Sequence, residues 1–356
     1  MLEFLLKKTT VYDRIRSSHK PLLLYGMGNG AQKVARALNE HGIEYSGIVA
    51  SDGFARGNIF LNYPVLSFAE AECIYGDFDC ILCFGIEKYE LDMLYEIEKR
   101  HTVYYPDLSL YGETHMTKQM LLSEMTEAER VFDLLTDDRS KEIYLQNLEF
   151  AITGDRHCLD WRQTDFDHPS EYYAHGGIHI DIGAYDGDTA TEYASKNGKC
   201  TRILAVEPDK KTFVHLKTNT AFDARIECIN AAASDHDGVI SFAAGSGRGS
   251  AIGEGATIEA VTVDRLANRK KAFADGYDIG SIKIDAEGAD ADVLCGAVNT
   301  LCDCMPCISV AVYHRAGDIW RLPYYLHKLC GRYRFALLRK PFCLPTWDTF
   351  AVAIKK

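Results

Sequence analysis

Residues 178–189, with the sequence IHIDIGAYDGDT, constrain the fold of this chain more than any other segment. The isoleucines at 178, 180 and 182 are β-branched and favour a buried strand, although His179 interrupts the apolar run. Gly183 and Gly187 then remove side chains where a ligand must approach the backbone. From Thr189 onward the residues can start a helix. The segment is therefore typical of a strand, a ligand-binding loop and a helix.

A second apolar strand is expected over residues 202–206 and ends at Glu207, about twenty residues after the glycine turn. In doubly wound folds an acid at this place binds the ribose hydroxyls of a nucleotide ligand. The ligand of such a site is either a dinucleotide or S-adenosylmethionine.

The charge of the loop separates these two ligands. A dinucleotide site requires the spacing G-x-G-x-x-G, so that a helix N-terminus holds the pyrophosphate. The loop here carries Asp181, Asp186 and Asp188, which would repel a pyrophosphate but attract the ammonium and sulfonium groups of S-adenosylmethionine. The pattern favours the methyl donor, and an ordinary strand, turn and helix is the alternative.

Further blocks of sequence follow in order along the chain. They are Glu171-Tyr172-Tyr173, the loop above, AVEPD at 205–209, AASDHDG at 232–238, VTVDRL at 261–266, IKIDAEGAD at 282–290, and VAVYH at 310–314 followed by DIWRLP at 318–323. In these blocks the chain, from Tyr172 to its end, resembles the FkbM family of S-adenosylmethionine-dependent methyltransferases. The resemblance implies an α/β class I methyltransferase fold, in which helices sandwich a mostly parallel sheet. Its last hairpin, over 333–338 and 349–354, would be antiparallel.

The resemblance assigns the donor site to two loops. The loop expected around the methionine part of S-adenosylmethionine consists of Asp181, Gly183, Ala184, Tyr185, Asp186, Gly187 and Thr189. Either Asp181 or Asp186 would face the ammonium group. Glu207 would accept hydrogen bonds from both ribose hydroxyls, because a carboxylate has two acceptor oxygens.

Two further donor contacts each have an alternative interpretation. Asp235 would accept a hydrogen bond from the adenine amino group, or it would belong to a polar turn before a strand at 239–243. Tyr172 would line the donor pocket as an aromatic wall, or it would pack in the core, since tyrosine has an apolar body and a polar tip.

The acceptor side of the site is expected where an alternating strand leads into Asp285 and Glu287, because open α/β sheets bind ligands at the carboxyl ends of their strands. One of these acids, or His314 after the next strand, would deprotonate an acceptor hydroxyl as a general base. Alternatively, the acids would only orient the acceptor, and proximity would supply the rate. A divalent metal held by the three side chains is another alternative, but their spacing is not diagnostic and we expect no metal.

The first part of the chain carries another glycine loop, Gly26-Met27-Gly28-Asn29-Gly30, after an apolar run at 21–25. With strands expected at 43–49, 77–85 and 103–106, it predicts a small Rossmann-like domain. The loop departs from G-x-G-x-x-G. The domain therefore either binds a nucleotide, such as the nucleotide part of a sugar nucleotide, or serves packing or dimerisation.

Two helices are expected between these domains, over 126–135 and 140–150. Thr126 and Glu129 have the spacing of a capping box for the first helix, and Asp138 or Ser140 would cap the second. The expected boundaries are 1–115 for the Rossmann-like domain, 116–170 for a helical linker and 171–356 for the methyltransferase domain.

Composition limits the remaining functions. A length of 356 residues with 47% hydrophobic residues allows two buried cores. The net charge of −12 argues against nucleic acid as a substrate. No apolar run approaches the ~18 residues of a membrane span, and residues 1–6 are too short for a secretory signal. We therefore expect a cytoplasmic enzyme, and a homodimer is compatible with the sequence.

The twelve cysteines are scattered, as is typical of reduced thiols in a cytosolic protein. Cys302, Cys304 and Cys307 have a spacing that zinc would accept with a fourth ligand. Packing is the alternative that we favour for them, because a free cysteine behaves as a small hydrophobic residue.

The sequence thus predicts an S-adenosylmethionine-dependent enzyme that methylates a hydroxyl of a sugar, a nucleotide sugar or a related small metabolite. The oxygen acceptor and the sugar rest on the resemblance alone. One alternative is an NAD(P)-dependent oxidoreductase that uses the Gly26–Gly30 loop, although no catalytic Tyr/Lys or His/Asp set accompanies that loop. The other is a non-catalytic nucleotide-binding or scaffold protein, against which the near-complete donor motifs count.

Overall fold

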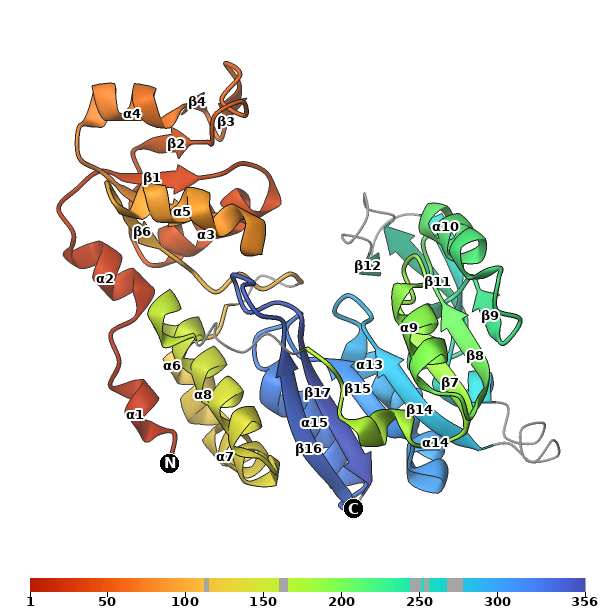
Figure 1. Cartoon of the computed structure of the whole chain (residues 1–356). Coiled ribbons are helices and arrows are strands. Elements are labelled where there is room, and N and C mark those ends of the chain that lie inside the picture. The colour runs from red at the N-terminus through yellow and green to blue at the C-terminus, as the bar shows by residue number, and fades with distance from the viewer. Residues whose placement is uncertain (112–114, 160–165, 244–250, 253–255, 268–277, 356) are drawn as a thin grey trace.

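The computed structural model describes residues 1–111, 115–159, 166–243, 251–252, 256–267 and 278–355. The chain forms an amino-terminal α/β domain and a larger carboxyl-terminal α/β domain, and helices of the intervening segment lie below the amino-terminal domain, beside β16 of the carboxyl-terminal sheet (Figure 1). Both domains are built around sheets, as the sequence predicts.

The amino-terminal sheet has the strand order β3-β4-β2-β1-β5-β6. Its strands are β1 (Leu22–Tyr25), β2 (Gly47–Val49), β3 (Ile59–Phe60), β4 (Tyr63–Leu66), β5 (Asp79–Leu82) and β6 (Thr102–Tyr104). All pairings are parallel except that of β3 with β4. The predicted Rossmann-like domain is confirmed, but β3 and β4 were not expected, because they are short and, apart from Val65, their residues are exposed or half-buried.

Helices and loops cover this first sheet. They are α2 (Val11–Ser17), α3 (Asn29–Glu40), α4 (Phe68–Tyr75), the short turn η1 (Lys88–Glu90) and α5 (Leu91–Glu98). The serine before α4 and Glu70 form a complete capping box, which fixes where that helix begins.

The carboxyl-terminal sheet has the order β16-β17-β15-β14-β7-β8-β9. Its strands are β7 (Gly177–Ile182), β8 (Cys200–Val206), β9 (Ile226–Ile229), β14 (Ile279–Ile284), β15 (Cys307–Ala311), β16 (Tyr333–Arg339) and β17 (Thr349–Lys355). β9, β8, β7, β14 and β15 run parallel, whereas β17 is antiparallel to both β15 and β16. The predicted antiparallel hairpin is therefore confirmed.

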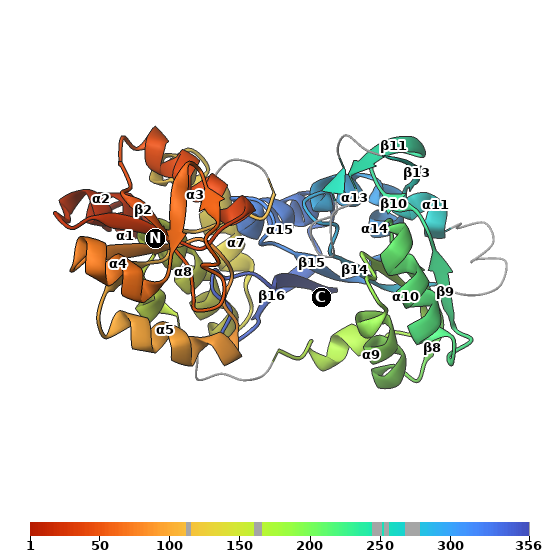
Figure 2. The same cartoon turned by 90° about the horizontal axis from the view of Figure 1, so that it is seen from above.

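Helices cover both faces of this sheet (Figure 2). α9 (Asp188–Lys196) and α10 (Lys210–Thr220) pack on one face, where they share a core with Ile203 and Ala205 of β8. α13 (Asp290–Cys295), α14 (Val298–Cys304) and α15 (Asp318–Leu329) pack on the other face against alternate residues of β7 and β14. Because successive side chains of a strand point to opposite faces, each strand contributes to both cores.

A small second sheet extends the domain beyond β9. It has the order β10-β13-β11-β12, with β10 (Ala232–Ala233), β11 (Gly238–Ala243), β12 (Ala251–Ile252) and β13 (Ala256–Val261). The helix α11 (Val263–Ala267) follows it.

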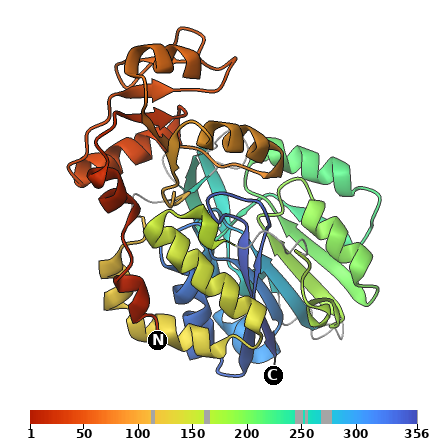
Figure 3. The same cartoon turned by 60° about the vertical axis from the view of Figure 1, so that its left-hand side comes forward.

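The helical segment packs against the carboxyl-terminal sheet (Figure 3). It contains α6 (Lys118–Ser123), α7 (Met125–Leu134) and α8 (Asp138–Thr153), followed by the turns η2 (Arg156–Cys158) and η3 (Ser170–Tyr173). α7 lies against α15, and α8 lies against β16. Buried residues of α7 and α8, together with Leu2 and Leu5 at the start of the chain and in α1 (Glu3–Leu6), belong to the same hydrophobic core as β7 and β14.

The helix starts differ from the prediction. Glu129 does not close a capping box with Thr126, because it instead accepts a hydrogen bond from the backbone of Leu2 and pairs with the terminal amine. α8 is capped by Asp137, whose carboxylate accepts from the backbone of Ser140 at 2.7 Å. Contacts with the first two residues of the chain thus explain why Glu129 does not cap α7.

None of the helices in the described ranges combines the length and the apolar character that a membrane span requires.

Candidate functional site

The loop after β7 is shaped by close backbone contacts. Gly183 has a φ of +73°, and a Cβ there would lie only 1.9 Å from the carbonyl oxygen of Asp285. Gly187 has a φ of +92° and precedes α9. The hydroxyl of Thr189 in the first turn of α9 donates to Oδ2 of Asp181 at 2.7 Å. The sequence predicts that a ligand approaches the backbone at Gly183, but in the structure it is the backbone of Asp285 that lies close to this glycine. The loop is therefore held against the end of β14.

Glu207, which follows β8, has a carboxylate that the backbone holds in place. Its Oε2 accepts a hydrogen bond from the amide of Tyr185 at 3.1 Å, and its Oε1 accepts from the amide of Asp209 at 2.8 Å. Burial raises the pKa of Glu207 to about 7, although these two hydrogen bonds act in the opposite direction. A carboxylate held in this way keeps lone pairs free for hydroxyl groups of a ligand.

Lys283 projects from β14 between two acids, and the sequence analysis did not identify it. Its Nζ lies 3.4 Å from Oδ1 of Asp181 and 3.6 Å from Oδ2 of Asp285, and it donates to the carbonyl oxygen of Gly183 at 2.9 Å. Burial would lower the pKa of Lys283, but the surrounding carboxylates raise it above its ordinary value. The charged ammonium therefore links the loop after β7 to the acids after β14.

Asp285 is ionised at neutral pH. Burial would raise the pKa of Asp285, but the nearby Lys283 ammonium and the imidazole of His314 outweigh burial and hold this pKa well below its usual range. The hydroxyl of Tyr313 also donates to Oδ1 of Asp285 at 3.2 Å. Asp285 is thus a fixed negative charge at the end of β14.

Glu287 differs from Asp285 in its protonation. Burial raises the pKa of Glu287 to about 7, against His314 and a hydrogen bond from Tyr111, which both lower it. Its backbone has a φ of +50°, which is unusual for a residue with a side chain. A carboxyl group that changes protonation near neutral pH can act as a general base.

His314 lies behind the two acids, and none of its side chain is exposed. Its Nδ1 is 2.7 Å from Oδ2 of Asp290, and its Nε2 is 3.3 Å from Asp285 and 3.6 Å from Glu287. Burial would lower the pKa of His314, but Asp290 and Asp285 raise it well above its ordinary value. A protonated imidazole cannot accept a proton, so this charge state does not favour His314 as the base, and its role there stays a prediction.

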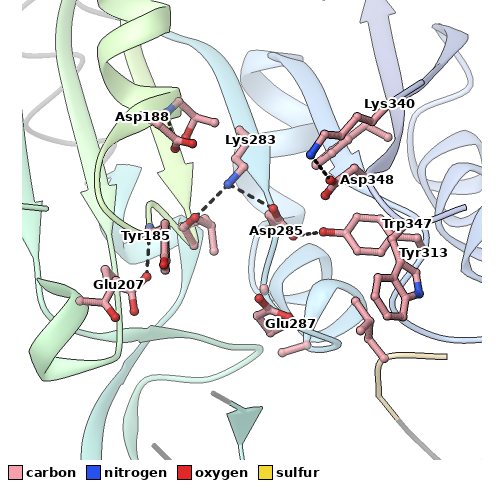
Figure 4. A pocket seen from close by; sticks show the side chains of 18 of the residues that line it. Tyr185, Asp188, Glu207, Lys283, Asp285, Glu287, Tyr313, Lys340, Trp347 and Asp348 are labelled. Carbon is pink, nitrogen blue, oxygen red and sulfur yellow. Dashed lines mark hydrogen bonds and ion pairs between the residues drawn. The ribbon is translucent and has the colours of Figure 1, made fainter. Parts of the chain in front are cut away.

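These groups meet around a cavity of about 540 Å³, a usual size for a ligand site. Of the predicted site residues, it is lined by Gly183, Tyr185, Thr189, Glu207, Asp285 and Glu287. Figure 4 shows Tyr185 and Glu207 on one side, Tyr313 and Trp347 on the other, and Lys283 and Asp285 between them. The cavity thus has a donor side and an acceptor side.

Other predicted residues support the cavity from outside its wall. Asp181, Ala184 and Gly187 are buried in the loop beneath it, Asp186 is partly buried, and none of the four is among the lining residues. Their expected contacts with a ligand stay predictions.

Tyr172 lies in the core of this structure and is not among the residues that line the cavity. Its ring is 2% exposed, stacks on His168 at 4.4 Å between centroids, and meets the ring of Tyr193 edge-on at 5.7 Å. His179, which interrupts the apolar run of β7, belongs to the same group, because it stacks on Tyr193 at 3.7 Å and hydrogen-bonds Ser281. The packing alternative therefore describes Tyr172.

Asp235 also lies outside the cavity wall. Its Oδ1 is 2.6 Å from Nδ1 of the exposed His236, within a polar turn before β11. Residues 231–233, just before it, line the cavity instead. The arrangement agrees with the turn alternative for Asp235.

The glycine loop of the amino-terminal domain is explained by packing. A Cβ at Gly26 would lie 2.6 Å from the ring of Phe84, and a Cβ at Gly30 would lie 1.9 Å from the carbonyl oxygen of Cys83. The ammonium of Lys33 in α3 donates to two backbone carbonyls of the segment after β6. These glycines let α3 approach the end of β5, and the loop does not line the cavity.

Within the described parts of the chain, no group of three or more His, Cys, Asp or Glu side chains is arranged to hold a metal ion. Neither the Asp285, Glu287 and His314 set nor the cysteines at 302, 304 and 307 form such a group.

The cavity also contains residues that the sequence analysis missed. Glu87, Tyr89 and Glu90 come from the amino-terminal domain, and Lys340, Trp347 and Asp348 come from the β16–β17 loop. No local pattern marks them, because their meeting depends on how two domains pack.

Comparison with known proteins identifies the fold around this cavity. Residues 181–338 match the model of the methyltransferase FkbM domain. These residues form an FkbM methyltransferase domain. The protein is therefore an enzyme, an S-adenosylmethionine-dependent methyltransferase, as the sequence predicts.

A solved structure shares the fold of both halves of the chain. The FkbM methyltransferase from Methylobacillus flagellatus KT aligns over 96% of this chain and 92% of its own, with a TM-score of 0.66 and 17% sequence identity. The architecture around the FkbM domain, including the amino-terminal domain, is therefore shared with that protein.

More distant structures align with about half of the chain. Aeropyrum pernix fibrillarin in complex with S-adenosyl-L-methionine covers 50% of this chain and 66% of its own, at 12% identity and a TM-score of 0.31. A precorrin-6y C5,15-methyltransferase from Geobacter metallireducens GS-15 covers 52% and 85%, at 12% identity and a TM-score of 0.33. No curated protein sequence matches the chain.

Proposed function

We propose that the enzyme binds S-adenosylmethionine on the donor side of the cavity and methylates a hydroxyl of a sugar or a related small metabolite. The observation that carries this proposal is the placement of Glu207 and Glu287 on one cavity, at the ends of β8 and β14. Glu207 is suited to accept hydrogen bonds from ribose hydroxyls, and Glu287 is suited to remove a proton from the acceptor.

The donor side fits S-adenosylmethionine in shape and in charge. The backbone at Gly183, the carboxylate of Glu207 and the small residues 231–233 lie along one wall. Asp188 adds a further negative charge at the start of α9. When bound, S-adenosylmethionine supplies a methyl group activated by a sulfonium, and its net positive charge suits this wall.

The acceptor side has one group suited to general-base catalysis. Glu287 lines the cavity and has a pKa of about 7, so at neutral pH a large part of it is ionised and able to accept a proton. Asp285 stays ionised and orients the acceptor, with Lys283 and Tyr313 fixing its two oxygens. The charged imidazole of His314 lies behind both acids and holds them in position. Asp290 in turn holds the imidazole.

Donor binding is tested by isothermal titration of the full-length protein with S-adenosylmethionine and with S-adenosylhomocysteine. We expect micromolar affinity, and we expect Glu207→Ala to weaken it by about 5- to 100-fold, because hydrogen bonds to the ribose are lost. Glu227→Ala is the matched control, since Glu227 lies on the neighbouring strand β9 and pairs with Arg202 at the surface. If the Glu207 and Glu227 variants bound S-adenosylmethionine with equal affinity, Glu207 would not contact the donor.

A further inference from the structure

The acceptor side of the cavity is built jointly by the two domains. Ile86, after β5, and Leu344, in the β16–β17 loop, exchange two backbone hydrogen bonds of 2.7 and 2.9 Å. The indole Nε1 of Trp347 donates to the carbonyl oxygen of Leu108 at 2.8 Å. A Cβ at Gly85 would lie 2.4 Å from the Trp347 ring, so the two segments touch without space between them. The segment 85–90 of the amino-terminal domain is therefore part of the cavity wall.

The lining of the whole cavity is rich in acids. The acids that line the cavity are Glu87, Glu90, Asp188, Glu207, Asp285, Glu287 and Asp348, whereas the lining cations are Lys283 and Lys340. Lys340 is shared between Glu87 and Asp348, at 3.2 Å from each. Lys283 is shared between Asp181 and Asp285. Among the lining residues that the structure describes there is no arginine or histidine, and both lysines already pair with carboxylates.

Aromatic rings accompany the acids around the cavity. The lining aromatic residues are Tyr89, Phe166, Tyr185, Tyr313, Trp347 and Phe350. Figure 4 shows Trp347 and Tyr313 near Asp348 and Lys340, across from Glu207. Tyr89 is 79% exposed and extends from the segment 85–90. Flat apolar faces beside paired acceptor oxygens suit a ring that carries hydroxyl groups. Such a ring would be either uncharged or positively charged.

We propose that the acceptor is a hydroxyl-bearing ring compound without phosphate, neutral or cationic, and that the segment 85–90 binds it. This inference rests on the proposed function and narrows it. A phosphate or pyrophosphate on this side would face Glu87, Glu90, Asp348 and Glu287, and like charges repel. Within the described lining, both cations are already paired with carboxylates. Nucleotide sugars, which the sequence predicts among the acceptors, therefore do not suit the described wall, whereas glycosides and amino sugars fit.

The charge of the acceptor is tested with the full-length protein and S-adenosylmethionine carrying a radiolabelled methyl group. A small-molecule extract of the source cells is divided by anion exchange into an unretained and a retained fraction, and each is used as the acceptor. We expect label to enter the unretained fraction. Labelling confined to the retained fraction, and released from the column after phosphatase and pyrophosphatase treatment, would overturn the inference. No label in either fraction, with donor binding intact, would contradict the proposed function itself.

The role of the segment 85–90 is tested with two variants. Glu90→Gln removes one charge but preserves the capping interaction with the backbone of Glu87, because glutamine also serves at that position of a capping box. Tyr89→Ala truncates an exposed ring and therefore leaves the core intact.

With the labelled fraction as a limiting acceptor, each of the two variants is expected to slow transfer by about fivefold or more, because one acceptor contact is lost. The dissociation constant of S-adenosylmethionine should stay within about twofold of the wild type. Glu44→Gln, which removes an exposed charge elsewhere in the same domain, is the matched control. If both wall variants behave like this control, the segment 85–90 does not bind the acceptor.

Discussion

At the scale of single residues, the three groups expected to compete as the base are distinguished by their charges. Asp285 is held ionised and His314 is held protonated, whereas burial raises the pKa of Glu287 to about 7. We predict that Glu287→Gln lowers kcat by about 10²- to 10⁴-fold. Since a base must be ionised, kcat of the wild type should rise with pH through about 7, and the variant should lose this rise.

The measurement is kcat at saturating S-adenosylmethionine between pH 5.5 and 9, because kcat reports groups of the bound complex and so separates Glu287 from donor binding by Glu207. Asp285→Asn is the comparison: it should reduce kcat but keep the rise near pH 7, since Asp285 does not titrate in this range. A rise that persists in Glu287→Gln would assign the base to another group.

His314 should also stabilise the fold in a pH-dependent way. Its folded-state pKa is raised above the unfolded value of about 6.5, so its stabilisation is complete below that pH and is lost as the pH rises through the folded-state pKa. We predict that His314→Gln costs ~3 kcal/mol at pH 6, because Asp290 loses its buried partner, and less at pH 9.

Urea denaturation of the wild type and the variant at both pH values measures this difference. His236→Gln is the control, since His236 pairs with Asp235 at the surface and its replacement should change stability by less than about 0.5 kcal/mol. A cost for His314→Gln that grows with pH would contradict a charged imidazole.

At the scale of elements, the loop after β7 depends on the absence of a side chain at Gly183. Alanine there would combine a positive φ with a Cβ 1.9 Å from a backbone oxygen, and the backbone cannot move aside as a flexible side chain can. We predict that Gly183→Ala destabilises the domain by at least ~3 kcal/mol and weakens donor binding.

Gly198→Ala adds the same methyl group in open space between α9 and β8, and it should change stability by less than about 0.5 kcal/mol. Thermal or urea denaturation, with donor titration of both variants, separates the two positions. If Gly183→Ala were as stable as Gly198→Ala, the loop would be more adaptable than these contacts indicate.

The strands and loops also show which residues of the site can be predicted from the sequence. Glu207, Asp285 and Glu287 were found because an apolar run fixes where a strand ends, and parallel strands bring their ends to one edge. Lys283 was missed because a lysine inside an alternating strand resembles a solvent-facing residue, whereas here two acids keep it 6% exposed. Trp347 was missed because it lies in a loop whose neighbours belong to another domain.

At the scale of the whole molecule, the chain crosses between the two cores more than once. Leu2 and Leu5 pack in the core of the FkbM domain with α7 and α8, before the chain enters the amino-terminal domain at α2. The chain returns after β6, where Tyr111 hydrogen-bonds Glu287 and its amide donates to the carbonyl oxygen of His314. The amino-terminal domain is thus tied on both sides to the site whose wall it completes.

This crossing makes α1 a part of the methyltransferase core, although it belongs to the predicted range 1–115. Leu5 and Leu24 are both fully buried, the first in the FkbM-domain core and the second in the core of the amino-terminal domain. We predict that Leu5→Ala and Leu24→Ala each cost about 2–5 kcal/mol, but in different places. Hydrogen exchange should accelerate in α7 and α8 for Leu5→Ala, and in β1 and β5 for Leu24→Ala. If Leu5→Ala instead loosened β1 and β5, the first residues would belong to the amino-terminal domain, and the domain boundary predicted from sequence would stand.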